Sequence, residues 1–308
     1  MISEKFGRVV KGLGGLFEVR LTDGERISCR AKGSLKRDEE KVLIGDAVAV
    51  EIDDSIPDGV VISSVQPRKN SLIRPPMANL DYIFIVFAAK KPSPVIETVD
   101  KLSAIAVHNG ITPIVVITKS DLDGECAKEY LNIYERAGIR AFVTSSENNE
   151  GISELSEFIT NTVKSGATAA FAGASGVGKS TLMNALFPTL ALKTQTISVK
   201  IERGRHTTRH VEIFDISDDE ETGFLADTPG FSLIDFERFD FFDIDELLPA
   251  FPDLLPYAAS CRYTDCAHVG ESSAECAIAK AVEDGAIEAS RLESYRTIYK
   301  TLKSKALY

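Results

Sequence analysis

The segment GASGVGKS, at residues 173–180, constrains the fold of this chain more than any other stretch. It matches the pattern G-x-x-x-x-G-K-[ST] at Gly173, Gly178, Lys179 and Ser180, between the apolar run TAAFAG and a helical stretch. Glycines let backbone N–H groups curl around an anion, and the N-terminus of the following helix adds partial positive charge. The segment therefore predicts a phosphate-binding loop.

The loop predicts how a nucleotide is held. We expect Lys179 to bridge the β- and γ-phosphates and Ser180 to give its hydroxyl oxygen to Mg²⁺. In GFLADTPGF an apolar strand ends in an acid, Asp227, which can face the metal through a water, and the amide of Gly230 can reach the γ-phosphate. An ordinary buried strand that ends in a turn is the weaker alternative. The expected phosphate-binding residues are Gly173, Ala174, Ser175, Gly176, Val177, Gly178, Lys179, Ser180, Thr181 and Gly230.

The segment GRHTTRH lies between the phosphate loop and Asp227 in the sequence. A threonine there can sense the γ-phosphate, and we favour Thr208 over Thr207. The expected magnesium residues are Ser180, Thr208 and Asp227, and Lys179 and Thr208 count among the catalytic residues.

Residues earlier in the chain predict which base is bound. VVITKSDL places Thr118, Lys119 and Asp121 directly after an apolar run, where parallel sheets form ligand crevices. An aspartate can accept two hydrogen bonds from guanine, whereas adenine offers no matching donors, so such a site discriminates by about 10⁴. Lys119 can lay its stem along the purine. Ser145 and Ser146, after a further apolar run, can present backbone amides to the guanine carbonyl.

The pattern along the chain predicts three domains. Residues 1–70 read as five short strands and predict a small closed barrel of the oligonucleotide-binding (OB) kind, with a generic β-module as the equal alternative. In residues 71–235 apolar runs alternate with helical stretches, which predicts a parallel α/β sheet carrying the phosphate loop. Residues 236–308 predict a small helical domain, in which DIDELLPAF and ASRLESYRTIYKTLKSKA look helical and flank a cysteine cluster.

The cysteine cluster has the spacing C-x₄-C-x-H-x₇-C. Its residues are Cys261, Cys266, His268 and Cys276. Three thiolates and an imidazole match a closed, structural zinc site with no open position for chemistry. The alternative is three buried reduced cysteines and a surface histidine.

Composition limits the classes of function. The net charge of −11 argues against a protein that coats nucleic acid indiscriminately. There is no run of 18 apolar residues and no signal-peptide pattern at the N-terminus, so we expect neither membrane insertion nor secretion. The expected location is the cytoplasm, and the expected state is a monomer that binds neither membrane nor DNA.

These motifs, in this order, resemble the circularly permuted GTPases of ribosome assembly. With the front barrel, GRHTT, DTPGF and the terminal cysteine cluster, the chain resembles the bacterial ribosome small subunit-dependent GTPase A (RsgA) family over essentially its whole length. The resemblance implies Mg²⁺-dependent GTP hydrolysis stimulated by the small ribosomal subunit, a role in late subunit maturation, and contacts of the barrel and zinc domain with ribosomal RNA.

Two positions depart from the family pattern. Thr118 stands where asparagine is usual, and the loss of the amide that ties the base to the phosphate loop predicts a lower nucleotide affinity. The last spacing in the cysteine cluster is seven residues instead of five, so that loop is enlarged.

The sequence also lacks an obvious group to orient the attacking water. Phe231 occupies the place where Ras-like proteins carry a glutamine, and phenylalanine cannot hydrogen-bond. His206 in GRHTT is our candidate for the missing group, as the resemblance also suggests, with a solvent-facing loop histidine as the even alternative. We expect slow turnover by the chain alone.

Two other functions compete with a GTPase assembly factor. A P-loop ATPase or phosphotransferase would leave Asp121 unexplained. An RNA-binding adaptor would use the nucleotide only to stabilise its fold.

Overall fold

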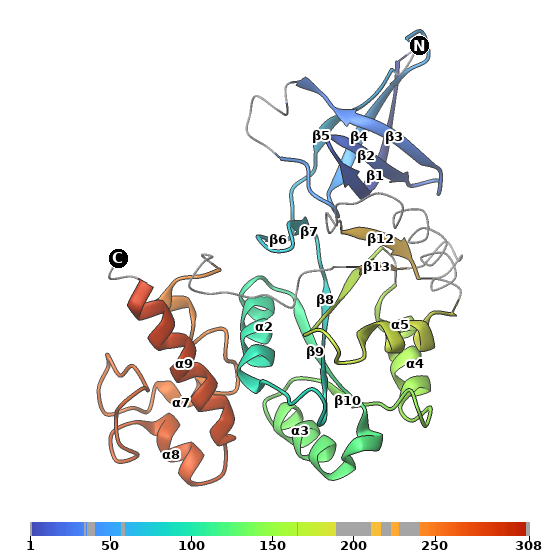
Figure 1. The fold of residues 1–308 in the computed structure, drawn as a ribbon. Coiled ribbons are helices and arrows are strands. Elements are labelled where there is room, and N and C mark those ends of the chain that lie inside the picture. The colour runs from blue at the N-terminus through green and yellow to red at the C-terminus, as the bar shows by residue number, and fades with distance from the viewer. Residues whose placement is uncertain are drawn as a thin grey trace. The chain divides into compact units, whose positions relative to one another are not determined.

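The computed structural model, drawn in Figure 1, contains two compact units. The first comprises Met1–Tyr82, Glu157–Phe171 and Phe187–Phe231, and the second comprises Ile83–Ser156, Ala172–Leu186 and Ser232–Tyr308. Within them, the structure describes residues 2–33, 35, 41–56, 59–164, 166–188, 211–216, 223–227 and 241–305.

A closed five-stranded barrel opens the first unit. Its strands are β1 (Ile2–Leu13), β2 (Leu16–Leu21), β3 (Arg26–Ala31), β4 (Ala47–Asp53) and β5 (Val60–Val65). β1 pairs with both β2 and β4, β2 pairs with β3, and β3 and β4 both pair with β5, so no strand of the ring is left without two neighbours. The predicted barrel is confirmed.

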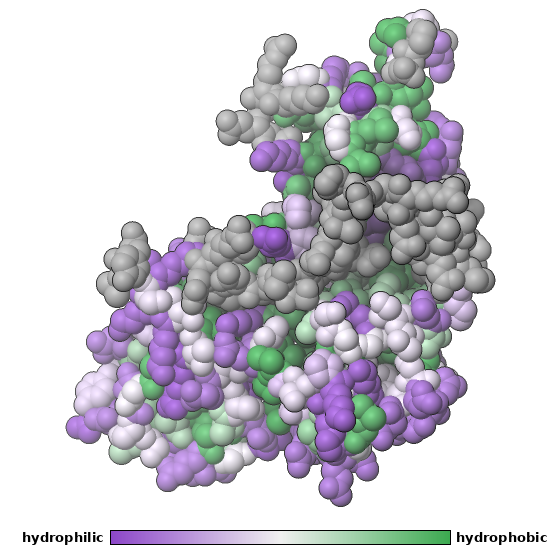
Figure 2. Space-filling model, viewed as in Figure 1, coloured by the Kyte–Doolittle hydropathy of each residue, from purple (hydrophilic) through white to green (hydrophobic). Residues whose placement is uncertain are grey.

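Apolar side chains from all five strands contribute to the buried core of the barrel. Val9, Val19 and Ile62 are fully buried. A side chain at Gly7 would place its Cβ 2.6 Å from the Arg20 carbonyl oxygen, so the close approach of β1 and β2 requires glycine there. Some apolar side chains of the barrel are exposed, among them Ile2, Phe6, Leu13 and Leu16. Hydrophobic residues, drawn in green, are visible on this part of the surface in Figure 2.

The rest of the first unit continues the barrel sheet. β11 (Thr168–Ala172) pairs in parallel with β13 (Phe224–Asp227), and β12 (Glu212–Asp215) pairs antiparallel with β13. The other edge of β12 pairs with β1 of the barrel. A short hairpin, β6 (Ser71–Leu72) and β7 (Met77–Ala78), and most of helix α4 (Ile152–Thr162) complete the described part.

The second unit contains three adjacent strands in the order β10-β9-β8, with helices beside them. The strands are β8 (Tyr82–Ala88), β9 (Thr112–Thr118) and β10 (Ala141–Val143), and β9 and β10 run parallel. Their side chains are almost all buried, as expected for a parallel sheet covered on both faces. The helices are α2 (Ile96–His108), α3 (Gly124–Arg136), α5 (Lys179–Leu186) and a single 3-10 turn, η1 (Ser120–Leu122).

The C-terminal part of the second unit is helical. It contains η2 (Ile244–Glu246), α7 (Leu255–Ala258), α8 (Ala277–Glu283) and α9 (Ala289–Lys305), and α9 packs against α2. The stretch DIDELLPAF, which looks like an α-helix in the sequence, forms only η2 and turns. The division of the chain at residues 70 and 235 stays a prediction. Among the described helices, none combines the length and the apolar character needed to span a membrane.

Candidate functional site

The phosphate loop connects β11 to α5, as its sequence predicts. A Cβ at Gly173 would lie 2.1 Å from the Val86 carbonyl oxygen, so the loop can leave the sheet this closely only with glycine. Gly176 and Gly178 both have positive φ, at 79° and 97°. The Lys179 ammonium lies over the loop and donates to the Gly173 carbonyl oxygen at 2.8 Å. Residues 174–176 are exposed, so the loop is open to a ligand.

Lys119 connects the base-reading segment to the phosphate loop. The residue follows β9 in a left-handed conformation with φ 57°. Its ammonium donates to the Gly176 carbonyl oxygen and to the Lys91 carbonyl oxygen, at 2.7 Å each. Two segments 57 residues apart in the sequence therefore lie side by side.

Thr118 makes a second connection between the same segments. Its hydroxyl lies 2.5 Å from the Val177 carbonyl oxygen in the phosphate loop and 3.1 Å from the Phe87 carbonyl oxygen. The sequence predicts that Thr118 lacks the amide that would tie the base to the phosphate loop. In the structure, the buried hydroxyl makes such a tie itself. Whether nucleotide affinity is lower stays a prediction.

The aspartate expected to read guanine is held by a serine. The Ser145 hydroxyl donates to Asp121 Oδ1 at 2.6 Å. The Ser145 amide donates to the Glu150 carbonyl oxygen at 2.9 Å, and the side chain is fully buried. This amide already donates within its own loop, and the role expected for it at the base stays a prediction. Ser146 is exposed, and the role expected for its amide stays a prediction.

The structure describes only some of the other residues that are predicted to bind the nucleotide. Ser180 and Thr181 lie exposed in the first turn of α5. Asp227 ends β13 in the first unit. His206, Thr208 and Gly230 lie outside the described residues.

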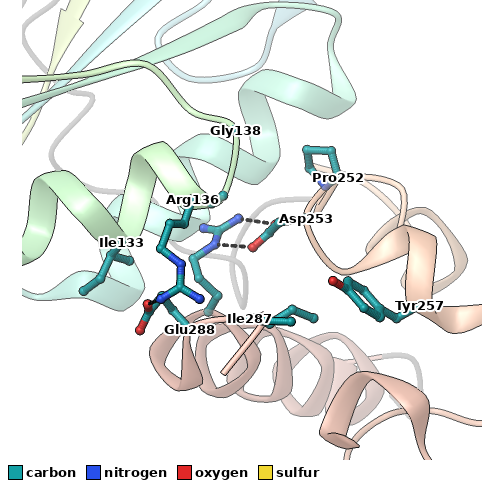
Figure 3. A pocket seen from close by; sticks show the side chains of 11 residues that line it. Ile133, Arg136, Gly138, Pro252, Asp253, Tyr257, Ile287 and Glu288 are labelled. Atoms are coloured by element: carbon teal, nitrogen blue, oxygen red, sulfur yellow. Dashed lines mark hydrogen bonds and ion pairs between the residues drawn. The ribbon is translucent and has the colours of Figure 1, made fainter. Parts of the chain in front are cut away.

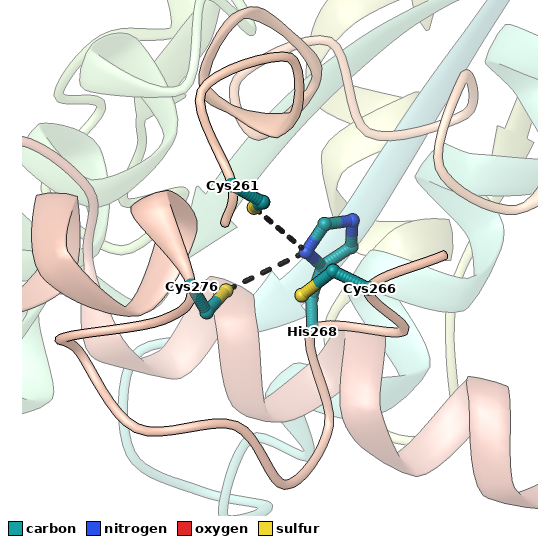
Figure 4. Close-up of side chains that lie close together, drawn as sticks. All are labelled: Cys261, Cys266, His268 and Cys276. Carbon is teal, nitrogen blue, oxygen red and sulfur yellow. Dashed lines mark hydrogen bonds between the residues drawn. The ribbon is translucent and has the colours of Figure 1, made fainter. Parts of the chain in front are cut away.

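The cysteine cluster comes together as predicted (Figure 4). Cys261, Cys266, His268 and Cys276 each offer one ligand atom, and these atoms all lie within 4.8 Å of one another. His268 Nδ1 lies 3.6 Å from Cys261 Sγ and 3.5 Å from Cys276 Sγ, which makes Nδ1 the nitrogen that faces the sulfurs.

The backbone around the cluster suits negatively charged sulfurs. The Ala277 amide donates to Cys261 Sγ at 3.3 Å and the Ala279 amide to Cys276 Sγ at 3.4 Å. Three thiols would gain little from such donors, whereas thiolates accept hydrogen bonds well. The donor set and its surroundings therefore fit a tetrahedral metal with sulfur and nitrogen ligands.

Glu271 organises the enlarged loop of the cluster. Its carboxylate accepts hydrogen bonds from the amides of Ala267, Val269 and Gly270 at 2.9–3.1 Å. Although burial opposes ionisation, these amides lower the pKa of Glu271. The loop is therefore an ordered structure around one carboxylate, which the spacing alone does not reveal.

A buried ionic cluster lies where the C-terminal helices meet α2, and the sequence gives no signal for it. Arg291 of α9 is 1% exposed and pairs with Asp100 of α2 at 2.5 Å and with Asp253 at 2.9 Å. Burial raises the pKa of Asp100, and the charge of Arg291 opposes that rise.

A pocket of about 330 Å³ lies beside this cluster (Figure 3). It is lined by residues at the end of α3, such as Ile133 and Arg136, and by Asp253, Ile287 and Arg291 of the C-terminal part. None of the predicted nucleotide residues lines it.

Fold and motif order together define the class of protein. The phosphate loop and the segment predicted to read guanine are tied together by Thr118 and Lys119, and the predicted base-reading segment comes first in the chain. This arrangement defines a circularly permuted P-loop GTPase.

Two family models match the chain within this class. The RsgA GTPase model matches residues 65–237, and the RsgA N-terminal domain model matches residues 6–61. The chain belongs to the RsgA GTPase family.

Relatives match over nearly their whole length. A protein of Bacillus velezensis named "Small ribosomal subunit biogenesis GTPase RsgA" is 36% identical, covering 97% of this chain and 98% of its own. The similarly named RsgA 2 of Listeria monocytogenes is 38% identical, with coverage of 97% and 98%.

Two solved structures share the fold. The crystal structure of YjeQ from Thermotoga maritima has a TM-score of 0.78 at 31% identity and covers 98% of this chain and 99% of its own. The crystal structure described as "YloQ, a circularly permuted GTPase" has a TM-score of 0.76 at 30% identity, with coverage of 98% and 96%.

Proposed function

We propose that this chain hydrolyses GTP in the late assembly of the small ribosomal subunit, and that the subunit stimulates hydrolysis. The two hydrogen-bonded ties between the base-reading segment and the phosphate loop carry the nucleotide part of the proposal, because they bring both halves of one site together. The relatives named as small ribosomal subunit biogenesis GTPases support the biological part. In this proposal the barrel and the C-terminal part contact ribosomal RNA.

Guanine is selected by hydrogen bonding. Ser145 holds one oxygen of Asp121, which orients the carboxylate for the N1–H and exocyclic amine of the base. The amide of Ser146 is the remaining donor for the guanine carbonyl. Lys119 covers the purine while its ammonium holds the loop.

The phosphates are held by amides of residues 173–181 and by the ammonium of Lys179. That ammonium exchanges its bond to the Gly173 carbonyl for phosphate oxygens. Oxygen donors from Ser180, Thr208 and Asp227 suit Mg²⁺, which would neutralise charge on the β- and γ-phosphates. Gly230 would add its amide at the γ-phosphate.

The cysteine cluster is proposed to hold one structural zinc ion. Sulfur and imidazole donors that lie this close together, with amides directed at two sulfurs, suit Zn²⁺ better than a hard cation. All four positions are filled by protein, so the metal would hold the C-terminal loops and take no part in hydrolysis.

One experiment tests the proposed function directly. Phosphate release from GTP and from ATP is measured with and without purified small subunits. We expect slow GTP hydrolysis alone, a stimulation of at least about tenfold by the subunits, and no comparable ATP hydrolysis, because ordering of a catalytic loop by a partner can raise GTPase rates by orders of magnitude. A preference for ATP would favour a phosphotransferase, and GTP binding without stimulation would favour an adaptor.

The same assay tests His206. Because Phe231 cannot orient water, we expect His206→Ala to lose most of the stimulated rate while nucleotide affinity stays at the parent value. His108→Ala is the control, since His108 ends α2 and packs on Phe242. Equal stimulated rates in the His206 variant and the parent would remove His206 from catalysis.

A further inference from the structure

The loop after β10 is closed at its base by two backbone hydrogen bonds. The Ser145 amide donates to the Glu150 carbonyl oxygen and the Glu150 amide donates to the Ser145 carbonyl oxygen, at 2.9 Å each. Gly151 follows with a φ of 68°, and a Cβ there would lie 2.0 Å from the Val143 carbonyl oxygen. The loop of residues 145–150 therefore has a fixed base against β10, and Glu150 lies at that base.

Two side-chain hydrogen bonds connect this loop to the segment that contains Asp121. The Ser145 hydroxyl donates to Asp121 Oδ1 at 2.6 Å, and the Ser120 hydroxyl donates to Glu150 Oε2 at 3.1 Å. The Ser120 amide adds a bond to the Thr144 carbonyl oxygen at 3.2 Å. Ser120 and Asp121 are neighbours in the chain, and the two loop residues are paired through their backbones. The four residues therefore form a closed ring.

The ring has a buried side and an exposed side. Ser145 is fully buried and Ser120 is 6% exposed, whereas the residues that carry the two carboxylates are exposed. Ser145 Oγ also accepts from the Asn148 amide at 3.2 Å, so its single hydrogen is free to point to Asp121. Each buried hydroxyl thus donates to one carboxylate, and the carboxylate of Asp121 stays open to a ligand.

Guanine recognition depends on how the Asp121 carboxylate is turned. A carboxylate that rotates freely can accept one hydrogen bond from the N1–H of a purine in many orientations. Two parallel bonds, to N1–H and to the exocyclic amine, require the carboxylate to lie close to the plane of the base. The bond from Ser145 fixes one oxygen, and the position of this hydroxyl in turn depends on the loop.

We infer that Glu150 is a positioning residue for guanine recognition, which acts through Ser120 to hold the loop of Ser145 against Asp121. The inference rests on the proposed function, because it takes Asp121 as the residue that reads the base. In this role Glu150 does not touch the nucleotide. It limits rotation of the Asp121 carboxylate, so that the bond to the exocyclic amine forms together with the bond to N1–H.

The test compares GDP with inosine diphosphate, which lacks the exocyclic amine. Dissociation constants for both are measured on the whole chain by competition with a fluorescent GDP, and their ratio reports the bond to the amine. Glu150→Ala should narrow this ratio by about three- to tenfold, the range expected for one hydrogen bond. A variant that only disturbs the fold or the phosphate loop would weaken both nucleotides equally and leave the ratio unchanged.

Partner variants test whether the effect passes through the Ser120–Glu150 bond. Ser120→Ala removes the donor and should narrow the ratio by the same factor, and the double variant should narrow it no further, because both changes remove one bond. Glu150→Gln keeps a carbonyl oxygen as acceptor and should stay within about twofold of the parent. Glu147→Ala removes an equal charge from an exposed position in the same loop and should leave the ratio unchanged.

Asp121→Ala separates this inference from the proposed function. If this variant leaves the ratio unchanged, Asp121 does not read guanine, and the proposed base site fails together with the inference. If Asp121→Ala narrows the ratio while Glu150→Ala and Ser120→Ala keep the parent ratio, only the inference is overturned.

Discussion

At the scale of single residues, the hydroxyl of Thr118 connects β9 to the phosphate loop at a position where the family pattern has the larger amide of asparagine. A hydroxyl has one hydrogen to donate, and the 2.5 Å distance to the Val177 carbonyl oxygen identifies the phosphate loop as the closer acceptor. Because Thr118 is 5% exposed, water cannot take over that bond when the hydroxyl is lost. The residue therefore helps to fix the shape of the site.

Thr118→Val tests this contribution. The shape is kept but a buried acceptor loses its donor, which costs about 1–3 kcal/mol, so we expect GTP and GDP affinity to fall by about tenfold. Thr118→Ser keeps the donor and should retain most of the affinity. Equal affinities for the valine and serine variants, measured by titration with a fluorescent nucleotide, would show that the hydroxyl bond does not matter.

At the scale of elements, the loop from His268 to Cys276 joins the cysteine cluster to the start of a helix. Cys276 is both a ligand candidate and the N-cap of α8, where its sulfur accepts from the Ala279 amide. Glu271 fixes the intervening turn through three amides. The seven-residue spacing between His268 and Cys276 thus leaves room for Glu271 to accept hydrogen bonds from the backbone of this loop.

The two roles of Cys276 can be separated by Cys276→Ser. Serine is a good N-cap, so the start of α8 is kept while a soft ligand is lost. We expect bound zinc to fall well below one ion per chain in elemental analysis and the melting temperature to drop. Cys126 lies outside the cluster, and Cys126→Ser should keep the metal. Full zinc content in the Cys276 variant would contradict the proposed ligand set.

At the scale of the whole molecule, local patterns could be predicted and long-range pairings could not. The phosphate loop and the cysteine cluster are short segments whose chemistry is fixed by spacing, so both could be predicted from sequence. The use of the Ser145 amide by Glu150, and the pairing of β1 with β12, depend on backbone partners that no spacing encodes. The prediction of a helix over DIDELLPAF was wrong. Its apolar residues follow a helical spacing, but the structure forms only η2 and turns there.

The buried cluster around Arg291 is another long-range feature, and it joins α2 to α9. Removal of the guanidinium would leave Asp100 and Asp253 buried without a counter-charge, which costs about 3–5 kcal/mol. We expect Arg291→Met to lower the melting temperature strongly. Arg136→Met breaks an ion pair with Glu288 and a hydrogen bond to the Gly285 carbonyl oxygen, but this arginine is 47% exposed, so the change should cost at most about 1 kcal/mol. Similar melting temperatures for the two variants would argue against a structural role for the cluster.

Strand β1 contributes hydrogen bonds to β2, β4 and β12 at once. Proteolytic clipping inside its twelve residues would therefore do more than shorten the chain. It would open the barrel and leave the edge of β12 that faces β1 without a hydrogen-bonding partner. Strand edges with unpaired amides and carbonyls pair with other chains. A preparation nicked there should aggregate while its phosphate loop is still intact.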